Sequence, residues 1–401
     1  MASRLEKIAV VGASLAGLRC AESLRALGFG GTLTVIGAEK HVPYDRPPLS
    51  KELLQGKWDV DKIGLRRKPY DELALDLRLG VRAAGLDLAA RELRLADGSR
   101  ERFDALVIAT GASARRLPGQ PELLGVHLLR SLDDSLAIRA ALERRPRVAV
   151  VGAGFIGSEV AASCRARGLE VTLLEPLPVP LGRGLGTRMG EVSAELHRDH
   201  GVDLRCGVGV TGFEGARRIE RLTLSDGSKL AADLVVVGVG AAPETAWLEG
   251  SGLRLENGVV CDSFCAAAPG VFAAGDVARW RNPLFDEDMR IEHWSNAVEQ
   301  GTYVAERLAG TDVGAQPFAP VPFFWSDQYE VKIQFAGRMR GDDEVRVVAG
   351  SVAERKFTAL YGRAGRLTGV LTFSRPRDLA KFRRLIAERA DFERAISAAS
   401  A

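Results

Sequence analysis

Two glycine-rich stretches contain the residue types and the spacing that hold a dinucleotide. The stretch "RVAVVGAGFIGSEVA", residues 147–161, puts Gly152, Gly154 and Gly157 in a G-x-G-x-x-G pattern between an apolar run and a helix-like run. The first glycine of such a loop permits a tight turn, the second lets backbone approach a pyrophosphate, and the third lets helix and strand pack closely. The phosphates then lie at the positive end of the helix, so this stretch predicts nucleotide binding.

The strand expected after this helix ends at Glu175, a position from which a carboxylate accepts hydrogen bonds from an adenosine ribose. That carboxylate would repel a 2′-phosphate, and the next three residues, "PLP", supply no arginine to bind one. These features favour NADH over NADPH, although Arg183 is close enough in sequence to leave NADPH open.

A similar stretch, "KIAVVGASLAGLRCA", begins at Lys7 but departs from the pattern at its second glycine. Gly12 and Gly17 take the first and third positions, and Ser14 takes the second. A hydroxyl can hydrogen-bond a phosphate, but the added side chain keeps the backbone slightly further from it. The following strand ends "VIGAE", so Glu39 is the nearest acid for a ribose. This stretch predicts a second, less regular nucleotide site.

An internal repeat places both loops in the same kind of supersecondary unit. Residues 7–37 and 147–175 each run strand, glycine turn, amphipathic helix and strand, within about 30 residues, the size of a parallel crossover. Apolar runs at 104–111, 233–240 and 270–278 are typical of buried parallel strands. We therefore expect an α/β protein with two Rossmann-like dinucleotide-binding domains.

The pattern changes after about residue 320. Runs such as "FFWSDQYEVKIQFAG" and "LTGVLTFS" alternate and are rich in aromatic and β-branched residues, which predicts an antiparallel sheet. A basic helix is expected near 376–390, and the final "ERAISAASA" is expected to fray. This part is expected to form a C-terminal α+β domain.

The bulk composition limits the class of protein. A chain of 401 residues is expected to form two or three domains, and its net charge of +3 argues against a general nucleic-acid binder. No apolar run reaches the length of a membrane span, about 18 residues. The chain leads almost directly into a strand without room for a signal peptide, so we expect a cytoplasmic protein.

The cysteines and histidines indicate neither disulfide nor metal chemistry. The five cysteines include no C-x-x-C pair and are interpreted as buried or incidental thiols. His197 and His200, three residues apart on an expected helix, are interpreted as a surface pair because no further ligands accompany them.

Two further stretches complete an ordered set of motifs. "LVIATG" ends at Gly111, and "GVFAAGDVA" contains Asp276. Two glycine units, an "ATG" strand and a "GD" strand, in this order, resemble the two-dinucleotide flavoprotein family of the glutathione-reductase fold. The resemblance implies that the first unit binds FAD and the second NAD(P)H, with Asp276 bonded to the ribityl chain of FAD. Hydride would then pass from the nicotinamide to the flavin.

The region that carries a redox cysteine in many members of that family has none here. Residues 41–56, "HVPYDRPPLSKELLQG", contain no cysteine, which excludes the disulfide reductases. The "PYDRPPLSK" segment resembles the FAD-dependent ferredoxin and rubredoxin reductases that serve oxygenases and cytochromes P450. Three further stretches fit that pattern: "LLRSLDDS" at 128–135, "RIEHWSNAVEQG" at 290–301 and "WSDQ" at 325–328.

This resemblance assigns roles to particular residues. It implies that Arg46, Lys51 and Arg130 contact FAD, and that Trp294 offers its backbone N–H to the flavin at the start of a helix whose dipole stabilises reduced flavin. Lys51 and Glu159 resemble the family's charge pair beside the site of hydride transfer, and they are the two expected catalytic residues. The expected cofactor contacts are Gly12, Ser14, Leu15, Ala16, Gly17, Glu39, Arg46, Lys51, Val81, Thr110, Gly111, Arg130, Gly152, Gly154, Phe155, Ile156, Gly157, Glu175, Gly240, Gly275, Asp276, Trp294 and Trp325.

One departure from the family concerns the ribose of FAD. The family usually has an aspartate where this chain has Ala38, so Glu39 has to reach further or FAD binds less tightly. Together with Ser14, this departure leaves open a protein in which only the second loop holds its nucleotide.

These observations predict an NADH:ferredoxin reductase of three domains. Residues 1–112 and 244–319 are expected to form the FAD domain, residues 113–243 the NADH domain, and residues 320–401 a C-terminal interface domain.

The resemblance also implies an acidic [2Fe–2S] ferredoxin as the partner, docked beside Trp325. Basic stretches at 65–69, 279–282, 337–341 and 376–384 would steer it, unless they are ordinary solvated faces. A rubredoxin is the alternative partner. The alternative activities are an NADH oxidase or quinone reductase, and a redox-sensing interaction flavoprotein whose dimerisation responds to NADH. A monomer or a homodimer is expected, with no nucleic acid or membrane as partner.

Overall fold

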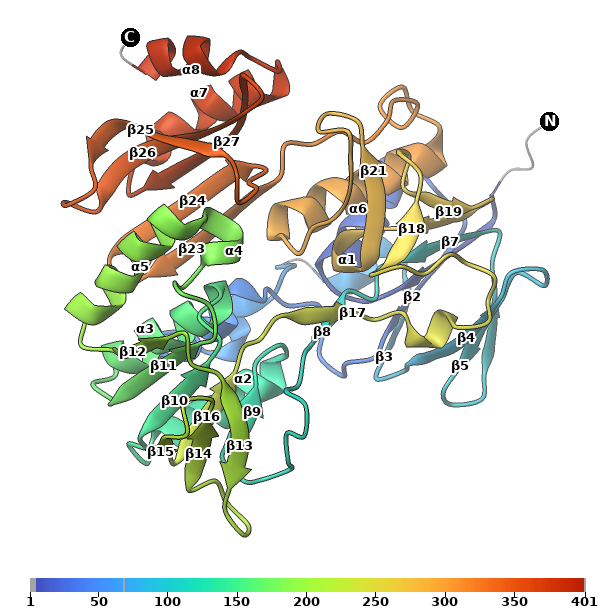
Figure 1. Ribbon diagram of the computed structural model, residues 1–401. Coiled ribbons are helices and arrows are strands. Elements are labelled where there is room, and N and C mark those ends of the chain that lie inside the picture. The colour runs from blue at the N-terminus through green and yellow to red at the C-terminus, as the bar shows by residue number, and fades with distance from the viewer. Residues whose placement is uncertain (1–4, 68, 400–401) are drawn as a thin grey trace. The chain divides into compact units, whose positions relative to one another are not determined.

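The computed structural model describes residues 5–67 and 69–399, which form two compact units (Figure 1). The first unit contains residues 5–45, 64–67, 69–113 and 242–323, and the second contains residues 46–63, 114–241 and 324–399. Each unit has a mainly parallel sheet with a glycine loop, as the repeat in the sequence predicts, so the expected α/β class is confirmed. The finer division into three domains stays a prediction.

The main sheet of the first unit has the strand order β19-β20-β7-β1-β2-β3. Its strands are β1 (Lys7–Val11), β2 (Thr32–Gly37), β3 (Asp76–Leu79), β7 (Ala105–Ile108), β19 (Ala266–Ala268) and β20 (Val271–Ala273). All neighbours pair in parallel except β19 and β20. Strands β1, β7 and β20 consist almost entirely of buried apolar residues, as expected for parallel strands that are covered on both faces, whereas the edge strands β3 and β19 are only partly buried.

Two helices of this unit pack closely together. They are α1 (Leu15–Ala26) and α6 (Trp294–Ala309). A Cβ atom added at Gly301 of α6 would lie 2.4 Å from the carbonyl oxygen of Ala16, so glycine permits this approach. Two small sheets complete the unit: β4 (Ala83–Asp87), β5 (Glu92–Leu95) and β6 (Arg100–Arg102), and β18 (Val259–Cys261), β21 (Ala278–Asn282) and β22 (Glu287–Arg290).

The second unit contains a five-stranded parallel sheet in the order β12-β11-β10-β16-β9. Its strands are β9 (Val126–Leu128), β10 (Val148–Val151), β11 (Val171–Glu175), β12 (Asp203–Cys206) and β16 (Leu234–Val237). The helices of this part are α2 (Leu132–Leu142), α3 (Phe155–Ala166), α4 (Gly182–Leu185) and α5 (Thr187–Asp199). A small antiparallel sheet consists of β13 (Val210–Glu214), β14 (Arg221–Leu224) and β15 (Lys229–Ala231).

Apart from Phe323, the first residue of β23, the predicted C-terminal antiparallel sheet lies in the second unit, in the order β23-β24-β27-β26-β25. Its elements are β23 (Phe323–Gln328), β24 (Val331–Gly337), β25 (Glu344–Ser351), β26 (Lys356–Arg363), β27 (Arg366–Phe373), α7 (Pro376–Ala387) and α8 (Phe392–Ala399). Apolar side chains of α5, among them Met189 and Leu196, share one core with Ile333 and Phe335 of β24. This common core explains why the C-terminal sheet belongs to the same compact unit as the second glycine loop.

The prediction that residues 393–401 fray is wrong for residues 393–399, and residues 400 and 401 lie outside the described residues. Residues 392–399 form α8, in which Phe392 and Ala395 are buried. A Cβ atom at Gly362 would come within 2.6 Å of the Phe392 ring, so the helix rests directly on β26. An apolar contact to a distant strand outweighs the weak helix tendency of a short terminal segment.

The interpretation of His197 and His200 as a surface pair is wrong for His197. The His197 side chain is fully buried, and its Nδ1 lies 2.8 Å from the hydroxyl of Tyr329. His200 stacks on the same tyrosine ring at 3.7 Å. The described residues contain no group of three or more histidine, cysteine or acidic side chains placed to hold a metal ion. Within residues 5–67 and 69–399, no helix is both long and apolar enough to cross a membrane.

The buried His197 predicts a pH-dependent stability. Burial, with a smaller contribution from His200, lowers the pKa of His197 from 6.5 to about 4. Between these values the unfolded chain binds more protons, so this contribution is complete above pH 6.5 and is lost as the pH falls toward 4. Urea unfolding measures this effect: as the pH falls from 6.5 to 4, we expect the free energy of unfolding to decrease by about 3 kcal/mol more in wild type than in His197→Gln. Equal decreases in the two proteins would contradict the lowered pKa of His197.

Candidate functional site

The first glycine loop joins β1 to α1 in the first unit. The backbone at Gly12 has φ +124, and a Cβ atom there would lie 2.0 Å from the carbonyl oxygen of Ala109, so the turn requires glycine. Ser14 precedes the helix in an extended conformation, and its side chain makes no capping hydrogen bond to the helix backbone. The N-terminal N–H groups of α1 are therefore not capped by this serine, and the arrangement suits a phosphate.

The candidate ribose acid of this unit is held by a tyrosine. Strand β2 ends at Gly37, and Glu39 follows two residues later. The hydroxyl of the buried Tyr44 donates a hydrogen bond to Oε2 of Glu39. Tyr44 thus fixes the direction of a carboxylate that lies beyond the position where the family usually has its acid.

Other expected FAD contacts of the first unit lie at strand and helix ends. Asp276 is in a short 3-10 helix, Gly275–Val277, and its backbone carbonyl accepts a hydrogen bond from Arg290 at 3.0 Å. Trp294 begins α6, and its indole N–H donates to Oδ1 of Asp45 at 2.7 Å. The hydroxyl of Thr110 donates to the carbonyl of Glu244 at 2.8 Å, so this side chain already has a backbone partner.

The second glycine loop joins β10 to α3 in the second unit. Gly152 has φ +97, and its added Cβ atom would lie 2.5 Å from the carbonyl oxygen of Gly238. At Gly154, which precedes α3, an added Cβ atom would meet no protein atom within 4 Å. Space is therefore left at the position where a backbone has to approach a pyrophosphate, and the residues present fit a dinucleotide.

Glu175 closes this nucleotide site at the end of β11. Its carboxylate is buried, and it accepts hydrogen bonds from the backbone N–H groups of Ala153 at 2.7 Å and Leu177 at 3.0 Å. A carboxylate has about four acceptor positions, so the two backbone bonds fix its orientation and leave acceptors for ribose hydroxyls.

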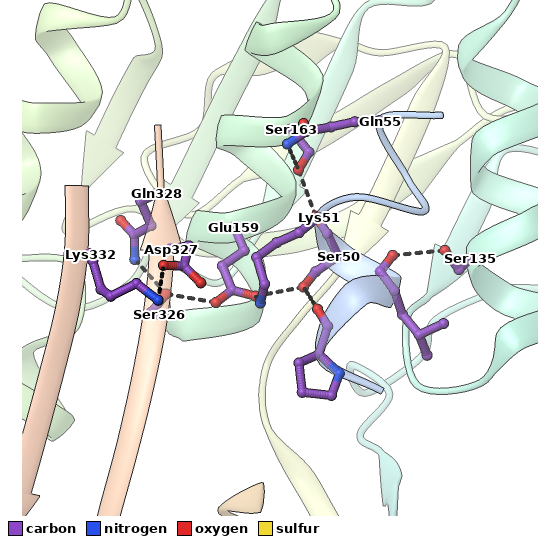
Figure 2. A network of polar contacts seen from close by, with 12 residues as sticks. Ser50, Lys51, Gln55, Ser135, Glu159, Ser163, Ser326, Asp327, Gln328 and Lys332 are labelled. Carbon is purple, nitrogen blue, oxygen red and sulfur yellow. Dashed lines mark hydrogen bonds and ion pairs between the residues drawn. The ribbon is translucent and has the colours of Figure 1, made fainter. Parts of the chain in front are cut away.

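A buried ion pair, between Lys51 and Glu159, lies in the second unit (Figure 2). Lys51 Nζ is 2.9 Å from Glu159 Oε2, and the two side chains are only 9% and 4% exposed. The hydroxyl of Ser50 donates to the same oxygen at 2.5 Å, and the hydroxyl of Ser326 donates to Oε1 at 2.7 Å. Burying an ion pair requires good geometry and further hydrogen bonds, and this pair has both.

The segment that carries Lys51 is anchored on two helices. Residues Pro47–Ser50 form a 3-10 turn just before Lys51. Ser163 of α3 donates to the carbonyl of Ser50 at 2.6 Å, and Ser135 of α2 donates to the carbonyl of Leu49 at 2.7 Å (Figure 2). The lysine backbone is thereby fixed to the same helix that carries Glu159.

Arg46 and Arg130 also lie together in the second unit. Arg46 Nη1 donates to the carbonyl of Arg130 at 2.7 Å. Arg130 directly precedes the capping box of α2, in which the carboxylate of Asp134 accepts the backbone N–H groups of Arg130 and Ser131. The Arg46 side chain is thus held by a backbone carbonyl, and the Arg130 backbone is held by the Asp134 carboxylate.

The expected site residues are divided between the units. The first contains Gly12, Ser14, Leu15, Ala16, Gly17, Glu39, Val81, Thr110, Gly111, Gly275, Asp276 and Trp294, and the second contains Arg46, Lys51, Arg130, Gly152, Gly154, Phe155, Ile156, Glu159, Gly157, Glu175, Gly240 and Trp325. The structure brings Lys51 to Glu159 and Arg46 to Arg130. The roles of individual residues toward FAD and NADH stay predictions.

Sequence reasoning missed the hydroxyl groups around these residues. Ser50, Ser326 and Tyr44 were not singled out, although they lie inside or beside the motif stretches "PYDRPPLSK" and "WSDQ". Serine and tyrosine are common at turns and on strands, so only their partners reveal the role. Strand alternation in "WSDQ" was the available signal, because it puts Ser326 and Gln328 on one face.

Comparisons with known proteins agree with this architecture. Residues 6–301 match the family model described as pyridine nucleotide-disulphide oxidoreductase, and residues 323–401 match the reductase C-terminal model. Rhodocoxin reductase of Rhodococcus erythropolis is 37% identical over 384 residues, which cover 95% of this chain and 89% of that protein. The ferredoxin reductase component of chlorobenzene dioxygenase from Cupriavidus sp. (strain PS12) is 38% identical, with 96% and 93% covered.

A solved structure extends the similarity to the whole fold. The crystal structure of the covalent putidaredoxin reductase–putidaredoxin complex contains a chain that matches with a TM-score of 0.91 and 33% identity. The match covers 96% of this chain and 93% of that chain.

The Tyr44–Glu39 contact predicts a specific effect on FAD affinity. Tyr44→Phe removes the hydroxyl that orients the carboxylate, and a lost hydrogen bond to a charged group costs about 1.5 kcal/mol, roughly tenfold in affinity. We expect FAD titration of the FAD-depleted protein, followed by fluorescence quenching, to show this weakening. Tyr303→Phe is the matched control, because that hydroxyl donates to the carbonyl of Gln316 instead. Unchanged FAD affinity in Tyr44→Phe would contradict the role of Tyr44.

Proposed function

Since the chain belongs to the pyridine nucleotide-disulphide oxidoreductase family, we propose that it is an FAD-dependent NADH:ferredoxin reductase. It takes electrons from NADH and delivers them to a [2Fe–2S] ferredoxin that supplies an oxygenase or a cytochrome P450. The observation that carries this proposal is the buried Lys51–Glu159 pair in a chain whose thiols are unsuited to disulfide chemistry.

The cysteines support a protein acceptor in place of a disulfide substrate. All five are free, and burial raises the pKa of Cys20, Cys164 and Cys261 to about 12. A thiol with such a pKa contains almost no thiolate near neutral pH, and the thiolate is the reactive form. Five free thiols also suit a reducing compartment, so a cytoplasmic location is part of the proposal.

The glycine loops and Glu175 hold the nucleotides in this proposal. The first loop, with Ser14 and Glu39, binds the pyrophosphate and ribose of FAD, and the second loop with Glu175 binds NADH. When bound, FAD supplies the two-electron and one-electron redox chemistry that no side chain of the chain provides. The protein's own part is to bind, orient and exclude water.

The Lys51–Glu159 pair places one ammonium group in a fixed position without leaving a net charge buried. Glu159 accepts one of the three N–H donors of Lys51, so the ammonium has further donors to direct at the flavin, as the resemblance implies. Glu159 is on the first turns of α3, the helix whose N-terminus is assigned to the NADH pyrophosphate.

The acceptor surface is assigned to the C-terminal sheet and helix α7. Trp325 is half-buried on β23, and Arg377 and Lys381 are exposed on α7, where Arg384 forms an ion pair with Glu388. By contrast, the basic stretch at 279–282 is neutralised by ion pairs from Arg279 to Glu256 and from Arg281 to Asp286 and Asp288. Of the stretch at 65–69, Lys68 lies outside the described residues. Positive charge on α7 would steer an acidic ferredoxin.

Anaerobic stopped-flow mixing tests the proposal directly. FAD-loaded protein is mixed with NADH, and the reduced protein is then mixed with a [2Fe–2S] ferredoxin or, in parallel, with a rubredoxin. We expect NADH to bleach the flavin and ferredoxin to be reduced at roughly ten per second or faster, which is ordinary enzyme turnover. If rubredoxin is reduced faster than ferredoxin, rubredoxin replaces ferredoxin as the proposed partner. If NADH bleaches the flavin but neither protein is reduced, the proposal is contradicted in favour of an NADH oxidase or a redox sensor.

The buried Glu175 predicts the coenzyme preference. Glu175→Gln keeps the size, removes the negative charge and replaces one of the two acceptor oxygens by an NH2 group, so we expect roughly tenfold weaker NADH binding and a smaller preference for NADH over NADPH. The measurement is kcat/KM for both coenzymes. Glu170→Gln, an exposed acid just before β11, is the matched control. An unchanged ratio of the two kcat/KM values would contradict the role of Glu175.

A further inference from the structure

The two oxygens of the Glu159 carboxylate are held by different parts of the chain (Figure 2). Oε2 accepts from Ser50 and Lys51, which lie on neighbouring residues of one turn. Oε1 accepts from Ser326, which is more than 160 residues later in the sequence and lies on β23. The two donors to Oε2 hold only one oxygen of the carboxylate, and the third donor, on Oε1, adds a second restraint against rotation about the Cγ–Cδ bond.

The direction of the Ser326 hydroxyl is set by Gln328. Gln328 Nε2 donates to Ser326 Oγ at 3.2 Å, and both side chains are fully buried. A serine hydroxyl has one proton to donate, and a carboxylate can only accept. Because Gln328 occupies an acceptor position of Ser326, the serine proton is directed at Glu159.

The oxygen of the Gln328 amide shows how the Ser326 proton could be directed away from Glu159. Gln328 Oε1 is buried and has no hydrogen-bond partner among the described residues. If the amide turned over, Oε1 would accept the proton of Ser326, and Glu159 Oε1 would lose its donor. The orientation of the Gln328 amide therefore decides whether Ser326 can donate to Glu159.

We propose that Ser326 is a positioning residue that fixes the Glu159 carboxylate against Lys51, with Gln328 orienting the Ser326 proton. This inference rests on the proposed function, since it assigns Ser326 to the charge pair of that reaction. In this view the C-terminal sheet contributes to the NADH half of the reaction as well as to the acceptor surface.

The kinetic test compares five FAD-loaded proteins, wild type and four variants, with NADH in anaerobic stopped flow. Ser326→Ala should lower the limiting rate of flavin bleaching roughly tenfold, the size expected for one lost hydrogen bond to a charged group. Ser326→Thr keeps the hydroxyl and should restore most of the rate. Ser158→Ala is the matched control, because Ser158 is also buried, neighbours Glu159 in sequence, and its hydroxyl has no partner among the described residues.

The division between rate and binding separates positioning from general damage. The NADH concentration at half-maximal rate should stay within about twofold of wild type in Ser326→Ala, because the lost bond is not to NADH. Gln328→Met has nearly the same length but cannot donate to Ser326, and we expect roughly a threefold fall in limiting rate. Rates equal to wild type in both Ser326→Ala and Gln328→Met would overturn the proposal.

A second measurement does not depend on catalysis. Urea unfolding of the holoprotein is followed for wild type, Ser326→Ala, Glu159→Met, which cannot accept the Ser326 proton, and the double variant. If Ser326 bonds to Glu159, the effects on unfolding free energy are not additive; strict additivity would overturn the contact. Failure of wild type to bleach with NADH would instead contradict the proposed function, while this cycle would still decide the contact.

Discussion

The contacts within the second unit serve to bury one ion pair, Lys51–Glu159, away from water. Removing Lys51 and Glu159 from solvent costs several kcal/mol for each charge, and only close pairing with further hydrogen bonds can offset that cost. The donors come from the turn before Lys51 and from β23. Loss of either partner would leave a bare buried charge, which is far more destabilising than loss of the pair together.

This requirement explains the arrangement of segments that are distant in sequence. The short segment 46–63 belongs to the second unit although it is surrounded in sequence by the first. Serines of α2 and α3 bind its backbone carbonyl groups at Leu49 and Ser50. The C-terminal sheet is attached to the same unit through the apolar core that Met189 and Phe335 share.

The sequence predicts most of the fold because periodicity and glycine spacing are local signals. The two strand–helix–strand repeats, the acid at Glu175 and the antiparallel C-terminal sheet are found as predicted. The features that were missed depend on contacts between distant residues. The burial of His197 depends on packing against the turn at Tyr329, and helix α8 depends on Phe392 resting at Gly362. The hydrogen bond from Ser326 to Glu159 was missed for the same reason, whereas Tyr44 and Glu39 are only five residues apart and their contact depends on the path of the loop between them.

Strand β23 is at the edge of its sheet, where strand pairing is least constrained. Because side chains alternate, a slip of one residue would turn Ser326 and Gln328 away and present Trp325 and Asp327 to Glu159. Asp327 would then bring a second carboxylate against a buried one, and like charges at such a site strongly disfavour each other. The Lys51–Glu159 pair therefore also disfavours a shifted register of this edge strand. The correct pairing of the C-terminal sheet is favoured by electrostatics as well as by its apolar core.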